Sequence, residues 1–187
     1  CFSMSLLYRV GIKVVAAHLR LSGCIIHGKE NIPEDKPILI IANHTSFGDP
    51  PVLAAVFPRP ITFMAKSAFT KNVWTRSIFG NLGVVFLDEK DNDFTALKAV
   101  LRLLKQGKTV GIFPEGTRHR DQVLGEFKTG AAFIGAKAKV SVLPVALLNT
   151  KDYWRFWKRN LVVNIGQEIP YMEDSLGGQK ALQDKTV

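Results

Sequence analysis

Residues 38–56 read ILIIANHTSFGDPPVLAAV, and this stretch decides the fold class. The five apolar residues Ile38–Ala42 are typical of a strand that is buried on both faces of a sheet. A short polar loop follows, and Asp49-Pro50-Pro51 then offers an N-cap residue and a proline in the first helical turn. A buried strand that passes through a tight loop into a helix predicts an α/β fold.

The rest of the chain repeats this alternation of apolar runs and helical patterns. Further strands are predicted at Ile61–Ala65, Val84–Leu87, Thr109–Phe113, Val140–Leu148 and Leu161–Ile165. Further helices are predicted at Phe69–Phe79, from Asp93 to a stop at Gly107, and at Gly130–Ala138. No repeat or linker interrupts the pattern. We therefore expect one globular domain, residues 28–187, with a mixed, largely parallel sheet flanked by helices.

An N-terminal segment, residues 1–27, precedes this domain and has the pattern of an amphipathic helix. At about 100° per residue, its cations fall on one arc of the helix and its large apolar residues on another. The cations are Arg9, Lys13 and Arg20, and the apolar residues are Leu7, Val10, Val14 and Leu21. A helix in a membrane surface and a helix packed on the domain fit this pattern equally well.

The whole chain contains no run of the ~18 apolar residues that a membrane-spanning helix needs, and no ordered secretory signal. Residue 1 is Cys rather than Met, so we expect that the chain has been cut at one or both ends. The apolar fraction of 47% excludes a disordered chain. Cys1 and Cys24 provide neither a disulfide framework nor a metal-ligand spacing, which indicates a reducing compartment.

The net charge of +9 is concentrated in three stretches. Residues 1–29 and 50–87 contain no acid, and residues 127–167 carry seven cations against Asp152 alone. Such blocks indicate an anionic partner, which is a nucleic acid, a lipid surface or a phosphorylated small molecule.

Two polar clusters each follow a predicted strand directly. Asn43–Asp49 follows Ile38–Ala42, and Pro114–Arg118 follows Thr109–Phe113. In α/β sheets, ligands bind at the carboxyl ends of strands. If these two strands are neighbours, an imidazole and a guanidinium face the same crevice.

In the first cluster, His44 precedes Asp49 by five residues. The carboxylate can accept a hydrogen bond from one ring nitrogen and leave the other basic. Ser46 lacks the Gly-x-Ser-x-Gly pattern of a nucleophile, so the attacking hydroxyl is expected to come from the substrate. On this cluster alone, the simpler interpretation is that Asp49 caps the helix and that His44 is an ordinary loop histidine.

The second cluster combines groups that bind phosphate. Gly116 lets a ligand approach the backbone closely, beside the hydroxyl of Thr117 and the guanidinium of Arg118. Lys128 adds a further cation ten residues on. An exposed turn is the alternative, but the apolar strand before the cluster favours a loop at the edge of a buried sheet.

Taken in order, these blocks resemble the signature blocks of the glycerolipid acyltransferases, specifically the lysophosphatidate (1-acyl-sn-glycerol-3-phosphate) acyltransferases. Asn43-His44-x-Ser46-x-x-Asp49, with its HX4D motif, resembles the first block, and Phe113–Arg118 resembles the third. Gly83–Asp88 resembles the second block and Val142–Ala146 the fourth. Lys66 and the segment Phe127–Ala131 match positions that follow the first and third blocks. The resemblance extends from about residue 28 to residue 168.

The resemblance implies transfer of a fatty acyl group from acyl-CoA or acyl carrier protein to the free hydroxyl of lysophosphatidate. It implies that His44 is the general base and Asp49 its orienting partner, without a covalent intermediate. The residues implied to bind substrate are Lys66, Glu115, Gly116, Thr117, Arg118 and Lys128. No cofactor and no metal are implied. The implied partners are a thioester donor, a lysophospholipid acceptor and an anionic membrane surface at the cytoplasmic face, and not nucleic acid. We therefore expect residues 1–27 to form an amphipathic helix at this membrane surface.

Two further features bear on this interpretation. The second block commonly ends in Asp-Arg, whereas Asp88 is followed by Glu89-Lys90, which puts the headgroup preference in doubt. Lys151–Arg159 interleaves four aromatic residues with four cations, a composition that favours a bilayer interface over nucleic acid here. Two other functions remain open: an acyl thioester hydrolase in which His44 activates water, and a non-catalytic basic lipid-binding module.

Overall fold

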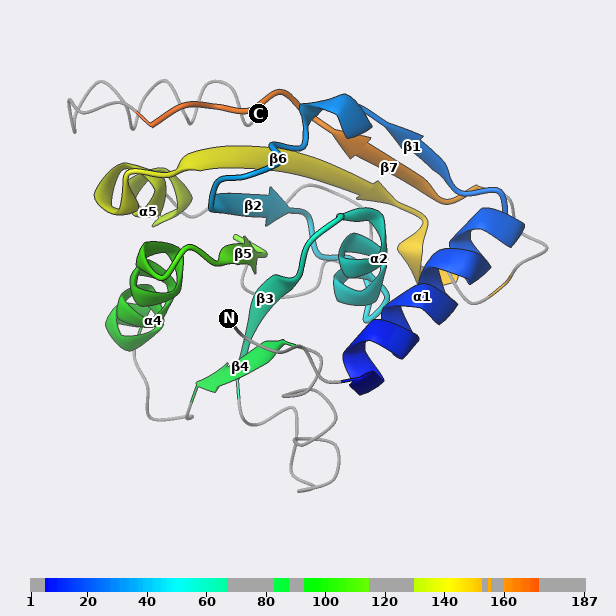
Figure 1. The fold of residues 1–187 in the computed structure, drawn as a ribbon, viewed down its shortest axis with the longest axis horizontal. Helices are drawn as coiled ribbons and strands as arrows, with labels where there is room; N and C mark the ends of the chain where they lie inside the picture. The colour runs from blue at the N-terminus through cyan, green and yellow to red at the C-terminus, as the bar shows by residue number, and fades with distance from the viewer. Residues whose placement is uncertain are drawn as a thin grey trace.

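The structure is a computed structural model, and it describes residues 6–66, 83–87, 93–114, 130–152, 155 and 160–171. Within these residues, helices and strands alternate along most of the chain (Figure 1). The strands are β1 (Ile25–His27), β2 (Ile38–Ala42), β3 (Ile61–Lys66), β4 (Val84–Leu87), β5 (Thr109–Ile112), β6 (Ser141–Leu148) and β7 (Val162–Ile165). The helices are α1 (Leu6–Leu21), α2 (Asp49–Val56), α4 (Asp93–Lys105) and α5 (Gly130–Ala138), with the 3-10 helices η1 (Lys29–Asn31) and η3 (Thr150–Asp152).

The described strands form one sheet in the order β1-β7-β6-β2-β5-β3-β4. The strands from β6 to β4 run parallel to one another, whereas β1 and β7 run antiparallel to β6. This arrangement confirms the mixed, largely parallel sheet that the sequence predicts. Strand β2 lies between β5 and β6, with Leu39 opposite both Val110 and Val142. The carboxyl ends of these three strands therefore meet at one edge of the sheet.

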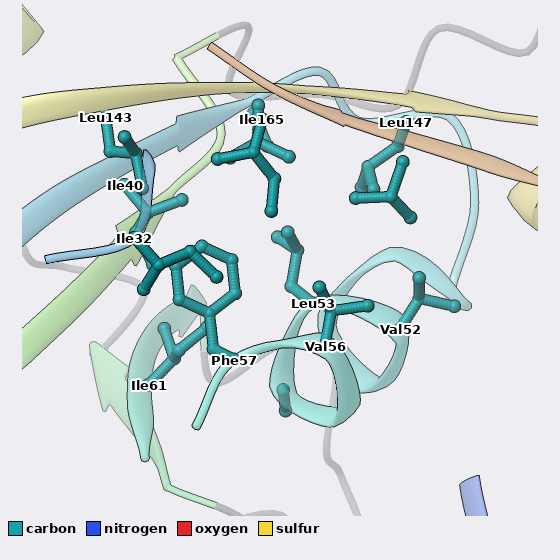
Figure 2. Close-up of a cluster of buried hydrophobic side chains, with 14 of the residues drawn as sticks. Ile32, Ile40, Val52, Leu53, Val56, Phe57, Ile61, Leu143, Leu147 and Ile165 are labelled. Carbon is teal, nitrogen blue, oxygen red and sulfur yellow. The ribbon is translucent and has the colours of Figure 1, made fainter. Parts of the chain in front are cut away.

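Helices cover both faces of this sheet, so β2 is buried on each side. Successive side chains of a strand point to opposite faces. The even-numbered residues of β2 pack in a core with α2, and the odd-numbered ones pack in a second core with α4 and α5. Figure 2 shows the first core, in which Leu53 and Val56 of α2 lie under the sheet. Burial on both faces explains the uninterrupted apolar run of β2.

Helix α1 packs against α2 with its inner side and exposes its outer side (Figure 1). Tyr8 and Leu19 are buried on the inner side. Four large apolar side chains, here called the outer stripe, are 51% to 78% exposed: Leu6, Val10, Val14 and Leu21. The helix is therefore packed on the domain, as one of the two interpretations predicts, and still presents an apolar surface. Nowhere in the described parts of the chain is a helix long and apolar enough to cross a membrane.

Most described elements lie where the sequence predicts them, with shifts of one or two residues at their ends. Helix α4 ends at the predicted glycine: Gly107 has φ 76°, and Lys108 N–H donates to the carbonyl of Leu103, as in a Schellman motif. Strand β1 is not predicted, because three exposed residues at a sheet edge carry too short a pattern. The helix predicted at 69–79 lies outside the described residues.

Candidate active site

The loop that connects β2 to α2 is anchored to β6 at its first residue. The side-chain amide of Asn43 donates to the carbonyl of Leu147 over 2.8 Å, and its Oδ1 accepts from Leu147 N–H over 2.7 Å. The side chain thereby takes the place of a backbone partner at the point where the backbone of β2 turns away. The loop that follows starts from a defined position at the sheet edge.

Asp49 is the first residue of α2 and is completely buried. The expectation that it is the N-cap of this helix is wrong, because Gly48 occupies that position. The Asp49 carboxylate binds the loop instead: its Oδ2 accepts from the backbone N–H of Thr45 over 2.7 Å and from that of Ser46 over 2.8 Å. The next two residues are prolines and have no N–H group. The first turn of α2 therefore offers few amides that compete for this carboxylate.

His44 lies in the same loop and forms the predicted pair with Asp49. The Nδ1 atom of His44 is 2.8 Å from Oδ2 of Asp49. A carboxylate can only accept a hydrogen bond, so in the neutral imidazole Nδ1 carries the proton and Nε2 has the lone pair. The side chain of His44 is 20% exposed, whereas that of Asp49 is 0% exposed. The pair thus buries the charge that orients the ring and leaves the ring itself partly accessible.

One face of the His44 imidazole packs against aromatic rings. The rings of His44 and Phe113 lie 4.1 Å apart between centroids, at 20° to each other. Phe63 stacks behind Phe113 at 6.0 Å and 9°. A side chain at Gly111 of β5 would place its Cβ 2.6 Å from the ring of Phe63, so this glycine makes room for the stack. The hydrogen bond to Asp49 restricts rotation of the imidazole within its plane, and the stack on Phe113 restricts tilting out of that plane.

Thr150, the first residue of η3 after the end of β6, completes the surroundings of Asp49. Its hydroxyl donates a hydrogen bond to Oδ1 of Asp49 and is fully buried. Nothing in the sequence interpretation assigns a role to Thr150 or to the ring of Phe113. Functional residues gather at the carboxyl ends of parallel strands. Applied to β5 and β6 as well as to β2, this rule would have pointed to Phe113 and Thr150.

The remaining predicted site residues are only partly described. Because β2 and β5 are neighbours, Phe113 and Pro114, the first residue of the second cluster, lie at the same sheet edge as His44. Lys66 is the last residue of β3, and its side chain is not described. The others lie outside the described residues: Glu115, Gly116, Thr117, Arg118 and Lys128. So do Asp88-Glu89-Lys90 and, apart from Lys151, Asp152 and Arg155, the aromatic segment Lys151–Arg159.

Ser46 and Cys24 are the two side chains considered as protein nucleophiles. Neither is hydrogen-bonded to His44 in the described part of the chain. The hydroxyl of Ser46 accepts from Gly48 N–H over 2.9 Å and bonds to Thr150. Burial raises the pKa of the Cys24 thiol to about 11, so this thiol stays protonated at neutral pH. The geometry is consistent with a hydroxyl that comes from outside the protein.

A partly accessible histidine that is bonded to a buried aspartate, at the carboxyl edge of a parallel sheet, defines a site that can remove a proton from a hydroxyl group or water. The family model described as Acyltransferase matches residues 23–148, from just before β1 to the end of β6. The chain belongs to the acyltransferase family.

Individual proteins of this family are similar to the chain over most of its length. It is 30% identical over 171 residues to the 1-acyl-sn-glycerol-3-phosphate acyltransferase of Borreliella burgdorferi, which covers 90% of this chain and 63% of that protein. It is 30% identical over 162 residues to the enzyme of the same name from Bacillus subtilis, covering 84% of this chain and 80% of that protein. The chain therefore spans less than two thirds of the Borreliella relative.

The fold is also similar to that of a solved structure. The crystal structure of the 1-acyl-sn-glycerophosphate (LPA) acyltransferase PlsC from Thermotoga maritima superposes with a TM-score of 0.68 at 24% sequence identity. The match covers 96% of this chain and 78% of that one. This likeness confirms the α/β fold.

Proposed function

We propose that the protein transfers a fatty acyl group from acyl-CoA or acyl carrier protein to the free hydroxyl of lysophosphatidate, and so forms phosphatidate. The observation that carries this proposal is the His44-Asp49 pair, with Nδ1 of His44 bound to a buried carboxylate. The names of the Borreliella and Bacillus relatives support lysophosphatidate as the acceptor.

In this mechanism His44 is the general base. Its Nε2 takes the proton of the acceptor hydroxyl while the hydroxyl oxygen attacks the carbonyl carbon of the thioester. Asp49 stabilises the imidazolium that forms and keeps the proton on Nδ1. When the carbon–sulfur bond breaks, His44 returns its proton to the leaving thiolate. The products are an ester and a free thiol, and no covalent enzyme intermediate forms.

We assign the acceptor phosphate to Arg118, with Gly116, Thr117, Lys66 and Lys128, and place Glu115 among the substrate-binding residues. A guanidinium binds a phosphate through two parallel hydrogen bonds. The support is that this cluster directly follows Phe113, whose ring is stacked on His44. A thiolate is a good leaving group because a thiol has a pKa of about 8.5, so the proposed reaction needs no metal and no cofactor beyond the donor.

We further propose that the protein binds the cytoplasmic face of an anionic membrane through α1. The outer stripe covers an arc of about 80° on the helix, next to an arc of about 40° that holds Arg9, Lys13 and Arg20. All three cations are exposed. An exposed apolar stripe beside cations suits the boundary between lipid headgroups and acyl chains.

The test is an assay of free thiol released from acyl-CoA, with and without lysophosphatidate. We expect release that depends on the acceptor, with phosphatidate as the lipid product. His44→Ala should lower kcat by roughly 100- to 10,000-fold, the usual contribution of a general base. His27→Ala is the matched control, because His27 is exposed at the carboxyl end of β1, which runs opposite to β2. This control should retain wild-type turnover.

The other outcomes separate the competing functions. Release that is independent of the acceptor indicates a thioester hydrolase, and no release indicates a lipid-binding module. Near-wild-type turnover by His44→Ala contradicts the mechanism. Arg118→Ala should raise KM for lysophosphatidate by roughly 10- to 100-fold and that for acyl-CoA much less, as expected for loss of a hydrogen-bonded charge pair.

A further inference from the structure

Thr150 is a buried hydroxyl that connects the end of β6 to the loop after β2. It is 0% exposed. Its Oγ1 contacts Oδ1 of Asp49, lies 3.0 Å from Oγ1 of Thr45 and lies 3.2 Å from Oγ of Ser46. Thr45 and Ser46 are 105 and 104 residues away in the sequence, so only the pairing of β2 with β6 brings these hydroxyls together.

The direction of the hydrogen bonds that Thr150 makes follows by elimination. An ionised carboxylate only accepts, so the single hydroxyl proton of Thr150 points to Asp49. The two lone pairs of Thr150 are then left as acceptors for Thr45 and Ser46. The hydroxyl of Ser46 accepts from Gly48 N–H, and its single proton is directed to Thr150 or, over 3.5 Å, to Oδ1 of Asp49. Each hydroxyl proton is therefore directed either to Asp49 or to Thr150, which itself donates to Asp49.

We propose that Thr150 is a positioning residue for the proposed acyl transfer, which holds the Asp49 carboxylate in the rotation that presents Oδ2 to His44. Two backbone amides bind Oδ2. In the described part of the chain, Oδ1 has only Thr150 and a long contact of 3.5 Å with Ser46. Without the Thr150 hydroxyl, Oδ1 loses its main donor inside the protein, where an unpaired charged oxygen is strongly disfavoured. The carboxylate then rotates or draws in water, and the orientation of His44 is lost.

The test compares substitutions that remove the hydroxyl with ones that keep it. Thr150→Val keeps the shape of the side chain and removes the hydroxyl. Thr150→Ser keeps the hydroxyl and removes the methyl group, and Thr150→Ala removes both. Thr109→Val is the matched control, because Thr109 is a buried threonine at the amino end of β5, away from the edge that holds His44.

In the thiol-release assay, Thr150→Val should lower kcat by roughly 10- to 100-fold, the range expected for a lost hydrogen bond to a charged group. KM for lysophosphatidate should stay within about threefold of wild type, because Thr150 does not contact substrate in this proposal. Thr150→Ser should restore kcat to within about threefold, and Thr109→Val should not change it.

A second readout needs no substrate. The Nδ1 proton of His44 should give a slowly exchanging NMR resonance, assigned by its absence in His44→Ala. It should persist in Thr150→Ser and broaden in Thr150→Val, because a loosened carboxylate exposes this proton to exchange with water. If Thr150→Val does not fold, as judged by circular dichroism, Thr150→Ala provides the same two measurements.

The two proposals can fail separately. Wild-type kcat and an unchanged His44 resonance in Thr150→Val and Thr150→Ala would overturn the role of Thr150 and leave the acyl transfer intact. A wild-type protein without acceptor-dependent release would overturn the proposed function, and the resonance would then decide the role of Thr150 alone.

Discussion

Helices α1 and α4 cover opposite faces of the same sheet, and their outer sides differ in chemistry. The exposed side chains that the structure describes on α4 are all polar: Thr95, Lys98, Arg102 and Lys105. On α1, the exposed side chains include the four apolar residues of the outer stripe. Water solvates the outer side of α4 at little cost, whereas exposed apolar area is unfavourable. The contrast shows that α1 presents an exposed apolar surface, which the described part of α4 lacks, and it is this surface that the proposed membrane binding uses.

The inner sides of the two helices are alike. Leu19 of α1 is 3% exposed and Leu104 of α4 is 1% exposed. Each lies in one of the two cores that enclose the sheet. The difference between the helices is therefore confined to their outer sides, and substitutions on each side separate packing from surface binding.

The largest effect is expected on the inner sides. Leu19→Ala and Leu104→Ala should each lower the free energy of unfolding by about 2–5 kcal/mol, because each leaves a cavity in a packed core. Chemical denaturation monitored by circular dichroism measures both. A loss of under about 1 kcal/mol for Leu19→Ala would show that α1 is not part of the cooperative domain. The inner sides of α1 and α4 would then not be equivalent.

The next largest effect is expected on the outer stripe. Val10→Gln combined with Val14→Gln should weaken binding to anionic vesicles by about tenfold or more, since burial of a valine side chain contributes about 1.5–3 kcal/mol. Lys98→Gln combined with Arg102→Gln on α4 is the control and should change binding by less than about threefold if α4 faces water. Co-sedimentation with vesicles measures the partitioning. Equal losses for the two pairs would mean that overall charge, and not the outer stripe, determines binding.

A smaller effect is expected from a single cation beside the outer stripe. Lys13→Gln should weaken vesicle binding by roughly fivefold at low salt, because one cation near an anionic surface contributes about 1 kcal/mol. The loss should disappear at high salt, whereas that of the valine pair should persist. A salt-independent loss for Lys13→Gln would assign this side chain to packing.

The smallest effect is expected at the helix ends, where the two helices do not differ. Gly23 after α1 and Gly107 after α4 have φ angles of 66° and 76°. Alanine at either position should cost about 0.5–1 kcal/mol of unfolding free energy, because left-handed strain exceeds the gain from a stiffer unfolded chain. Thermal unfolding measures both. A much larger loss at Gly107 would reveal a steric conflict, although its added Cβ meets nothing within 4 Å.

Much of the site could be predicted because its parts are close in the sequence. His44 and Asp49 are five residues apart, and a tight loop between strand and helix brings them together whatever the rest of the chain does. The substrate-binding roles of Glu115, Gly116, Thr117, Arg118, Lys128 and Lys66 rest on the resemblance and stay predictions. The cap position of Asp49 was misjudged because two prolines leave the first turn of α2 with few amide donors.

The sequence by itself determined the α/β class, because apolar runs of strand length and helical periodicities are local properties of the chain. Its ordered blocks also predicted the family, and the resemblance to that family implied the His44-Asp49 pair. What surrounds that pair could be seen only in the folded protein. Phe113 stacks on His44 because β5 lies beside β2, and Thr150 reaches Asp49 because β6 lies on the other side of β2. Strand order depends on packing among segments far apart in the chain, so local pattern does not specify it. For the same reason, only the structure could show which side of α1 is buried.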